Sequence, residues 1–316
     1  LSNVTNSISN TTALVKSLRE MTGAPVLDCK KALLSQEVNG DINKAIDWLR
    51  AKGLSKATDK SNSRQASEGL IALLYTKNKL TLLEINSETD FVARNNDFQT
   101  FVVNIINTAH HLPETGDINI DSLLSTKALI SGVKLDTTKD LLVEVVTRIR
   151  ENIVIRRAVN IPITDDSAIG YYVHGKISGD HIPSNIHMGS SAGVIALNSI
   201  NGKSDLISDA AKKLAMHIVA AKPQYLNITD IPNELIEKET VIFREQSKDA
   251  IANKKPELIE QIIKSKVNKR LNEITLYEQN HFIEEGSPVI RKYLDGLSKN
   301  NNTNINILYF HLWTLG

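Results

Sequence analysis

Two short apolar runs, residues 70–75 and 80–85, are separated by the polar residues Thr-Lys-Asn-Lys. Strand-favouring runs of this length with a short polar interruption predict a β-hairpin. Apolar side chains then recur at intervals of three and four over residues 98–109, which is the period of an amphipathic helix, and Asp97 before them can cap it. A hairpin needs a cover for its apolar face, so this helix is expected to lie on it. The pattern therefore predicts an α+β fold.

A further helix expected over residues 138–152 leads into an extended segment, 153–163. The second half of the chain then repeats this logic. Strand patterns then cover residues 169–177 and 193–200, and an apolar stripe predicts a helix over 205–221. The run 305–313 is expected to return as a last strand of the second sheet. Two related α+β subdomains follow, each a small antiparallel sheet with helices on one side.

The amino-terminal part has helical patterns too short to be stable alone. The clearest is capped by Asp41 after an Asn-Gly turn and carries an apolar stripe that ends before Gly53. A middle helix is expected over residues 26–35. Short helices need mutual packing, so residues 12–53 are expected to form a three-helix module like a ubiquitin-associated (UBA) domain.

A charged helical stretch follows Pro232 and is broken at Asn253-Lys-Lys-Pro before a second helix. Its apolar positions, which include Val241 and Leu258, suffice for one seam between two helices, and this predicts a protruding helical hairpin. The expected organisation is a tail or transit-peptide remnant (1–11), the three-helix module (12–53), a linker (54–67), a first subdomain (68–165), a second subdomain (166–232 and 275–316) and the hairpin (233–274).

Charge and motifs exclude several kinds of function. The 316 residues carry 37 Lys plus Arg against 36 Asp plus Glu, which gives no electrostatic reason to expect nucleic acid or a membrane as partner. The single cysteine, Cys29, excludes an internal disulfide. Phosphate-binding glycine loops are absent, and the histidine pairs lack the spacing of metal ligands. We therefore expect no cofactor, no metal and no nucleotide, and recognition of a partner by shape.

One polar junction stands between the hairpin and its covering helix. Residues 84–95 read EINSETDFVARN and place Phe91 beside Asp90 where the strand pattern gives way to the helix pattern. From the residues alone, the favoured interpretation is local: Phe91 staples the following helix and Asp90 caps it. The alternative is that the pair contacts another protein, since functional residues concentrate on such loops.

Several motifs together resemble the translation elongation factor Ts family. They are LREMTGAPVLDCKKAL (18–33), NGD (39–41), ETDFVARN (88–95), ENIVIRR (151–157), YVHG (172–175), LAMHIVAAKP (214–223) and INILYFHLWTLG (305–316). The resemblance covers the chain from about residue 12 to its end, in the order of the family. It implies guanine nucleotide exchange on elongation factor Tu, whose GDP form is bound and whose GDP is released faster, without covalent chemistry.

The resemblance also implies site residues. Within Thr89, Asp90, Phe91 and Val92, the central pair would enter the partner's nucleotide domain near its magnesium site. Lys30 matches a partner-facing position, with an ordinary solvated lysine as the alternative. Gly193 and His217 match further contacts of the family. His217, three residues after Leu214, is from the residues alone a packed core histidine.

Three departures and two rival functions accompany this interpretation. Residues 177–192 are expected to form a loop longer than in compact bacterial forms, Ala192 stands where a larger aliphatic residue is common, and the chain stops at Gly316 where the family usually continues. The acid-poor start and Asn-rich composition favour a mitochondrial form, with bacterial cytoplasm or a plastid as alternatives. The rivals are a UBA-like binding scaffold without exchange activity and an enzyme, for which no catalytic group stands out. Self-association is left open.

Overall fold

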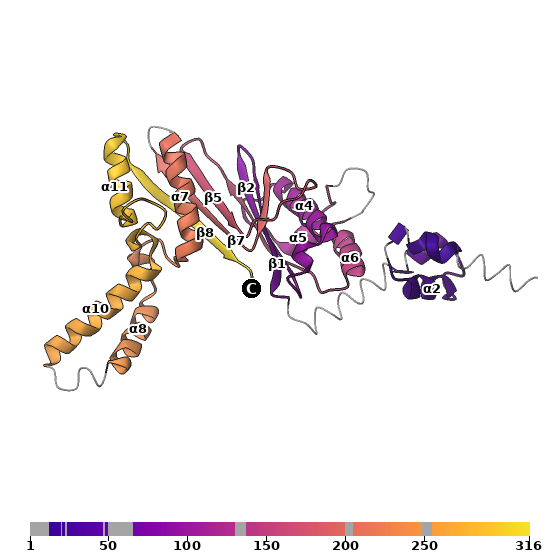
Figure 1. Ribbon diagram of the computed structural model, residues 1–316, viewed down its shortest axis with the longest axis horizontal. Helices are drawn as coiled ribbons and strands as arrows, with labels where there is room; N and C mark the ends of the chain where they lie inside the picture. Colours follow the sequence, from indigo (N-terminus) through magenta and orange to yellow (C-terminus); the bar gives the residue numbers. More distant parts are fainter. Residues whose placement is uncertain are drawn as a thin grey trace, which may run out of the picture. The chain divides into compact units, whose positions relative to one another are not determined.

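The structure is a computed structural model that describes residues 13–19, 21–22, 24–46, 48–49, 66–129, 137–199, 205–247 and 255–316 (Figure 1). The predicted α+β fold is confirmed. The chain divides into two compact units. The first comprises Leu1–Pro162, Gly175–Ser190 and Thr314–Gly316, and the second comprises Ile163–His174 and Ser191–Trp313. The expected tail, most of the linker, the helix end near Gly53 and the break near Asn253 lie outside the described residues.

A five-stranded antiparallel sheet forms the centre of the first unit, in the order β3-β4-β2-β1-β6. The predicted hairpin is confirmed, because Tyr75 of the first strand lies opposite Leu80 of the second. The strands are β1 (Glu68–Tyr75), β2 (Lys79–Ser87), β3 (Gly116–Asp117), β4 (Val154–Pro162) and β6 (Ile186–Gly189).

The prediction of a loop over residues 177–192 is wrong in its second half. Residues Ile186 and Met188 are buried at alternate positions of β6, which pairs with β1. This strand therefore belongs to the first unit, although the sequence pattern placed its residues with the second subdomain. A further strand, β7 (Ser191–Ser199), begins directly after it.

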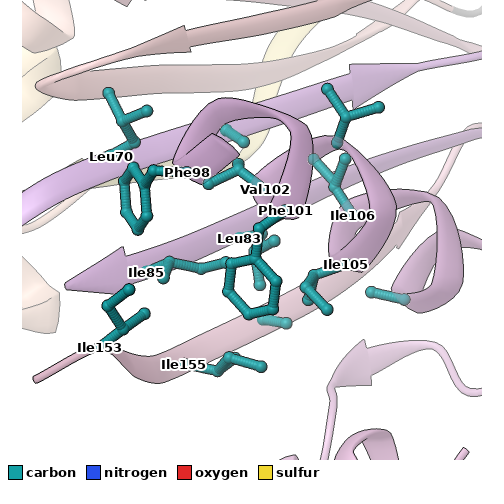
Figure 2. Close-up of a cluster of buried hydrophobic side chains, with 14 of the residues drawn as sticks. Leu70, Leu83, Ile85, Phe98, Phe101, Val102, Ile105, Ile106, Ile153 and Ile155 are labelled. Atoms are coloured by element: carbon teal, nitrogen blue, oxygen red, sulfur yellow. The ribbon is translucent and has the colours of Figure 1, made fainter. Parts of the chain in front are cut away.

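The expected helix covers one face of this sheet. Helix α4 (Asn96–His111) presents an apolar stripe that packs on the central strands, and Figure 2 shows Phe98 and Phe101 of α4 beside Ile85 of β2. Two more helices, α5 (Ile120–Ser125) and α6 (Thr138–Ile149), contribute to the same core. Phe98 is fully buried, so the helical period identified the core-facing side chains correctly.

The cap of α4 is Asn95, whereas the sequence pattern suggested Asp97. The Asn95 Oδ1 atom accepts hydrogen bonds from the backbone N–H groups of Asp97 (2.8 Å) and Phe98 (3.2 Å). The helix begins earlier because the short 3₁₀ turn η1 (Val92–Arg94) ends immediately before Asn95. Asp97 then lies in the first turn, where its carboxylate is favoured by the helix dipole.

The second unit holds a three-stranded sheet in the order β5-β7-β8, with β5 (Ser167–His174) antiparallel to β7. The predicted last strand is β8 (Ile305–Thr314), and the predicted helix is α7 (Asp205–Ala221). Helix α7 packs on the sheet with Leu214 and Ile218 fully buried. Helix α11 (Ile290–Asn300), which the sequence pattern did not predict, adds Ile290 and Leu294 to this core. The short turns η2 (Ile228–Asp230) and η3 (Leu276–Glu278) also belong to this unit.

The charged stretch forms two helices, α8 (Asn233–Gln246) and α10 (Pro256–Ile274), that share one apolar seam. Ile263 and Val267 of α10 are buried in this seam. The inclusion of Val241 and Leu258 among its apolar positions is not met, because these side chains are 67% and 44% exposed. Among the described helices, none combines the length and the apolar character needed to cross a bilayer.

The amino-terminal module contains α2 (Val26–Leu34) and helical residues 13–19 and 42–46 around a small core with Leu18 and Leu33. The cap predicted at Asp41 is confirmed, because its Oδ1 atom accepts hydrogen bonds from the N–H groups of Asn43 and Lys44. Cys29 is fully buried, and this burial raises the pKa of its thiol. A buried thiol of raised pKa is inert, so Cys29 is a packing residue.

Candidate partner-binding site

Residues 88–91, which we call the tip loop, connect β2 to the 3₁₀ turn η1. At its end, the Phe91 side chain is 79% exposed, more than any other large apolar side chain of the described residues. Asp90 beside it is also exposed. Within the part of the chain that the structure describes, the Asp90 carboxylate makes no hydrogen bond or ion pair. The two side chains are therefore free to contact another molecule.

The local interpretation of this pair is wrong. A hydrophobic staple would bury Phe91 against the next helix, but the ring faces solvent. A cap at Asp90 would accept N–H groups of that helix, but Asn95 fills this place and η1 has no side-chain cap. Neither side chain therefore stabilises the helix that follows the tip loop.

The tip loop has a firm support on its helix side. Val92, next to Phe91, is only 5% exposed and belongs to the core under α4. The buried side chain of Gln99 holds the following turn, since its Nε2 donates to the Ala93 carbonyl oxygen at 2.9 Å and its Oε1 accepts from the His181 Nε2 at 2.8 Å. One neighbour of the exposed ring is thus fixed in the core.

A second support lies on the strand side. The Glu151 carboxylate accepts two hydrogen bonds from Thr89, one from its N–H (3.0 Å) and one from its hydroxyl (2.7 Å). The next residue, Asn152, donates its N–H to the Glu88 carboxylate at 2.7 Å. We call Glu151 and Asn152 the clamp. The sequence pattern assigned no role to either residue, although both lie in the family motif ENIVIRR.

The seven sequence-predicted site residues differ in their local surroundings. Asp90 and Phe91 are exposed on the tip loop, while Thr89 and Val92 support it. Lys30 lies exposed on α2 of the amino-terminal module. The remaining two, Gly193 and His217, are buried inside the second unit.

Gly193 of β7 packs against the backbone of α7. A Cβ atom at this position would lie 2.5 Å from the Ala215 carbonyl oxygen and 2.9 Å from the Val219 Cγ2. Any other residue would push the helix off the sheet, so the close approach served by this glycine is internal to the unit.

His217 is fully buried and satisfied by its own unit. Its Nδ1 accepts from the Phe282 N–H at 3.3 Å, so its Nε2 is the donor to the Gln279 Oε1 at 2.9 Å. Burial lowers the pKa of His217, and the bond to Gln279 acts in the opposite direction. The core interpretation that the residues alone favoured is the one that the structure shows. The exposed side chain at this place is Phe282, 60% exposed, which the sequence pattern did not single out.

A neighbouring buried histidine predicts acid sensitivity. The His281 ring is fully buried, and its Nε2 has no hydrogen-bond partner among the described residues. Burial, reinforced by His217, lowers the pKa of His281 from 6.5 to about 4. Below pH 6.5, His281 is therefore protonated in the unfolded chain but stays neutral in the folded chain. The free energy of unfolding consequently falls as the pH drops towards 4.

The variant His281→Asn keeps an acceptor near the Ile283 N–H and removes this titration. When the pH is lowered from 7 to 4.5, the unfolding free energy of both proteins is expected to fall. The fall should be about 2 kcal/mol smaller for the variant than for the parent. Urea unfolding at both pH values measures the difference. The matched control is His111→Asn, at an exposed ring. Equal acid losses in the parent and His281→Asn would contradict the assignment.

The arrangement makes the tip loop a candidate recognition site. An exposed aromatic side chain beside a free carboxylate, on a loop fixed from both sides, suits insertion into another protein. The described residues contain no group of three His, Cys, Asp or Glu side chains placed to hold a metal ion. Fold and site together define a partner-binding regulatory protein of the α+β class.

Comparison with known proteins gives the family. The family model "Elongation factor TS" matches residues 88–316. Elongation factor Ts of Trichlorobacter lovleyi is 36% identical over 313 residues, covering 97% of this chain and 92% of that protein. The Rhodospirillum centenum factor is 34% identical (96% and 92% covered), and the Sinorhizobium fredii factor is 39% identical (85% and 81% covered). The chain belongs to the elongation factor Ts family, whose members are nucleotide exchange factors of translation and not enzymes.

Proposed function

We propose that this protein binds the GDP form of elongation factor Tu and accelerates the release of GDP by inserting Asp90 and Phe91 near the partner's magnesium site. The observation that carries the proposal is the Phe91 ring, 79% exposed on a loop held at both ends, within the family motif ETDFVARN. Burial of a large apolar ring is favourable by about 2 kcal/mol, and Phe91 can contribute this free energy only when it is inserted into the partner.

The proposed mechanism is mechanical and requires no group of this protein to bind the nucleotide. The Phe91 ring separates apolar side chains of the partner, and the Asp90 carboxylate brings a negative charge close to the metal and phosphate groups. Both effects weaken the hold on GDP. By thermodynamic linkage, GDP must then weaken the hold on this protein by the same factor, so the two compete through one coupling free energy.

The first test uses elongation factor Tu loaded with fluorescent GDP and chased with unlabelled GDP. Substoichiometric amounts of this protein are expected to accelerate the loss of fluorescence, because each molecule leaves after exchange and acts again. Spontaneous release without the protein is the control. Binding without acceleration would contradict the proposal and favour the alternative of a UBA-like scaffold, which the exposed tip loop does not support.

The other candidate residues take secondary places in this proposal. Lys30, exposed on the amino-terminal module, is proposed as a further contact with the partner. Gly193 and His217 are proposed to act indirectly, His217 through Phe282, whose N–H donates to its Nδ1, and Gly193 by allowing the close packing of α7 on β7. Self-association stays outside the proposal.

For the cellular compartment we propose a mitochondrion, with bacterial cytoplasm and a plastid as alternatives. The support is the composition of residues 1–12, which are rich in Ser, Thr and Asn and contain no acid. Targeting peptides are likewise Ser-rich and acid-poor, but the arginines that they usually carry are absent from this segment. The relatives compared above are bacterial, which is compatible with the first alternative.

A further inference from the structure

We infer that Glu151 is a positioning residue for nucleotide exchange: it holds the tip loop in the orientation in which Asp90 and Phe91 can enter the partner. The inference rests on the proposed function of this pair. Glu151 itself lies 62 residues from Thr89 in the sequence and is not assigned a contact with the partner.

The contact between Glu151 and Thr89 is specific in its geometry. Each carboxylate oxygen accepts one bond, Oε2 from the Thr89 N–H at 3.0 Å and Oε1 from the Thr89 hydroxyl at 2.7 Å. The bond from the N–H orients the peptide group before Thr89, and the bond from the hydroxyl fixes the side-chain rotamer of Thr89. Hydrogen bonds to a charged acceptor are the stronger kind. The residue directly before Asp90 is therefore held in one conformation.

Neighbouring contacts extend this control to the start of the tip loop. Asn152 donates its N–H to Glu88, and the Ser87 hydroxyl donates to the Thr89 carbonyl oxygen at 3.0 Å. Glu88 and Thr89 are thus held by two successive residues of the clamp. Asp90 and Phe91, which follow, keep exposed side chains. The loop is fixed where it leaves the strand and free where it would meet the partner.

The clamp is itself well anchored. Helix α6 ends at Ile149, and its C-cap Arg150 has the left-handed conformation (φ 67°), which ends the helix directly before Glu151. Asn152 and Ile153, directly after Glu151, are 3% and 4% exposed, and Ile153 belongs to the core under α4. A carboxylate mounted on buried residues can impose its geometry on an exposed loop, whereas a solvated side chain cannot.

Loss of the clamp should affect how often the tip loop is ready to insert. Without it, residues 88–91 sample other conformations, and the apparent affinity for the partner falls by the fraction that remains competent. Once Phe91 is inserted, its contacts are unchanged. Glu151→Ala is therefore expected to raise the half-saturating concentration about tenfold while the maximal exchange rate stays unchanged.

Three variants define the test in the fluorescent GDP assay. Glu151→Ala removes both acceptors. Glu151→Gln keeps one acceptor for the Thr89 N–H and can donate to the Thr89 hydroxyl, so it is expected to restore most of the affinity. Glu144→Ala is the matched control, because Glu144 lies on α6 and, among the residues that the structure describes, pairs only with the exposed Arg148 at 2.6 Å. It is expected to behave like the parent.

A double-mutant cycle separates positioning from a general loss of structure. In a Phe91→Ala background, Glu151→Ala is expected to have a smaller effect, because the ring is absent and only Asp90 still needs orientation. Amide hydrogen exchange should show faster exchange at Thr89 with unchanged protection in α4 and β2.

Two results would overturn the inference alone. These are an unchanged half-saturating concentration for Glu151→Ala while Phe91→Ala is impaired, or an equally large effect of Glu151→Ala in both backgrounds. A parent protein that fails to accelerate GDP release would instead contradict the proposed function, and the inference with it. Thr89 amide exchange reports on the clamp in either case, because it needs no partner.

Discussion

Phe91→Ala is expected to lower the maximal rate of stimulated GDP release by about tenfold or more. The proposed transition towards release buries the Phe91 ring in the partner, and burial of such a ring is worth about 2 kcal/mol, where 1.4 kcal/mol corresponds to a factor of ten. The measurement is the fluorescent GDP chase at saturating concentrations of this protein. Saturation matters because it separates the insertion step from the affinity that the clamp controls.

The control for Phe91→Ala must show an intact fold. The ring is 79% exposed, so its removal is expected to leave the unfolding transition unchanged. Leu206→Ala, at an apolar side chain of α7 that is 49% exposed, provides a matched truncation at a distant position in the sequence. A Phe91→Ala variant that stimulates release as fast as the parent would show that the ring is not the inserted group.

The second large effect concerns stability, at a charge inside the first unit. Glu84 of β2 is fully buried and accepts from Arg156 Nη1 at 3.0 Å and from Arg157 Nε at 2.6 Å. Both arginines are about half exposed, at 45% and 41%. Replacing both with methionine leaves a buried carboxylate without a cationic partner. The double variant is expected to lose about 3 to 5 kcal/mol of unfolding free energy.

The reverse change should cost much less. Glu84→Gln leaves two arginines that water can solvate, and its oxygen can still accept the Asn86 Nδ2, which lies 3.2 Å from Glu84 Oε1. The expected loss is about 1 to 2 kcal/mol. Native-state amide exchange of β2 and β4 measures both variants within the unit concerned. Equal losses would show that desolvation of the carboxylate does not dominate this ion-pair network.

Local periodicity explains which elements were predictable. The hairpin, α4 and α7 each bury a regular stripe, so their sequence period identified them and the bounds of α7 were correct. Strand β6 has only four residues between polar turns, and its partner β1 lies more than 100 positions earlier in the chain. No local signal specifies such a pairing. The choice of Asn95 over Asp97 as cap likewise depends on where η1 ends.

Residues of the candidate site could be proposed from the sequence where one motif contains them. Contacts between two segments that are distant in the sequence could not. Asp90 and Phe91 lie together in one motif, whereas the clamp joins residues that are 62 and 64 positions apart. His217 shows the opposite case, because a polar residue at the edge of an apolar stripe can be exposed or buried. His217 can be buried because Gln279, 62 residues later, accepts its hydrogen bond.

The order of segments in the first sheet also bears on how the nascent chain acquires its structure. Strand β6 closes the side of β1 but is made after all of β5, and Leu315 donates its N–H to Ser190 just beyond β6. A chain emerging from the ribosome through residue 165 would therefore carry β1 as an open edge, which is a template for aggregation. Translation must proceed past Gly189 before that edge is covered.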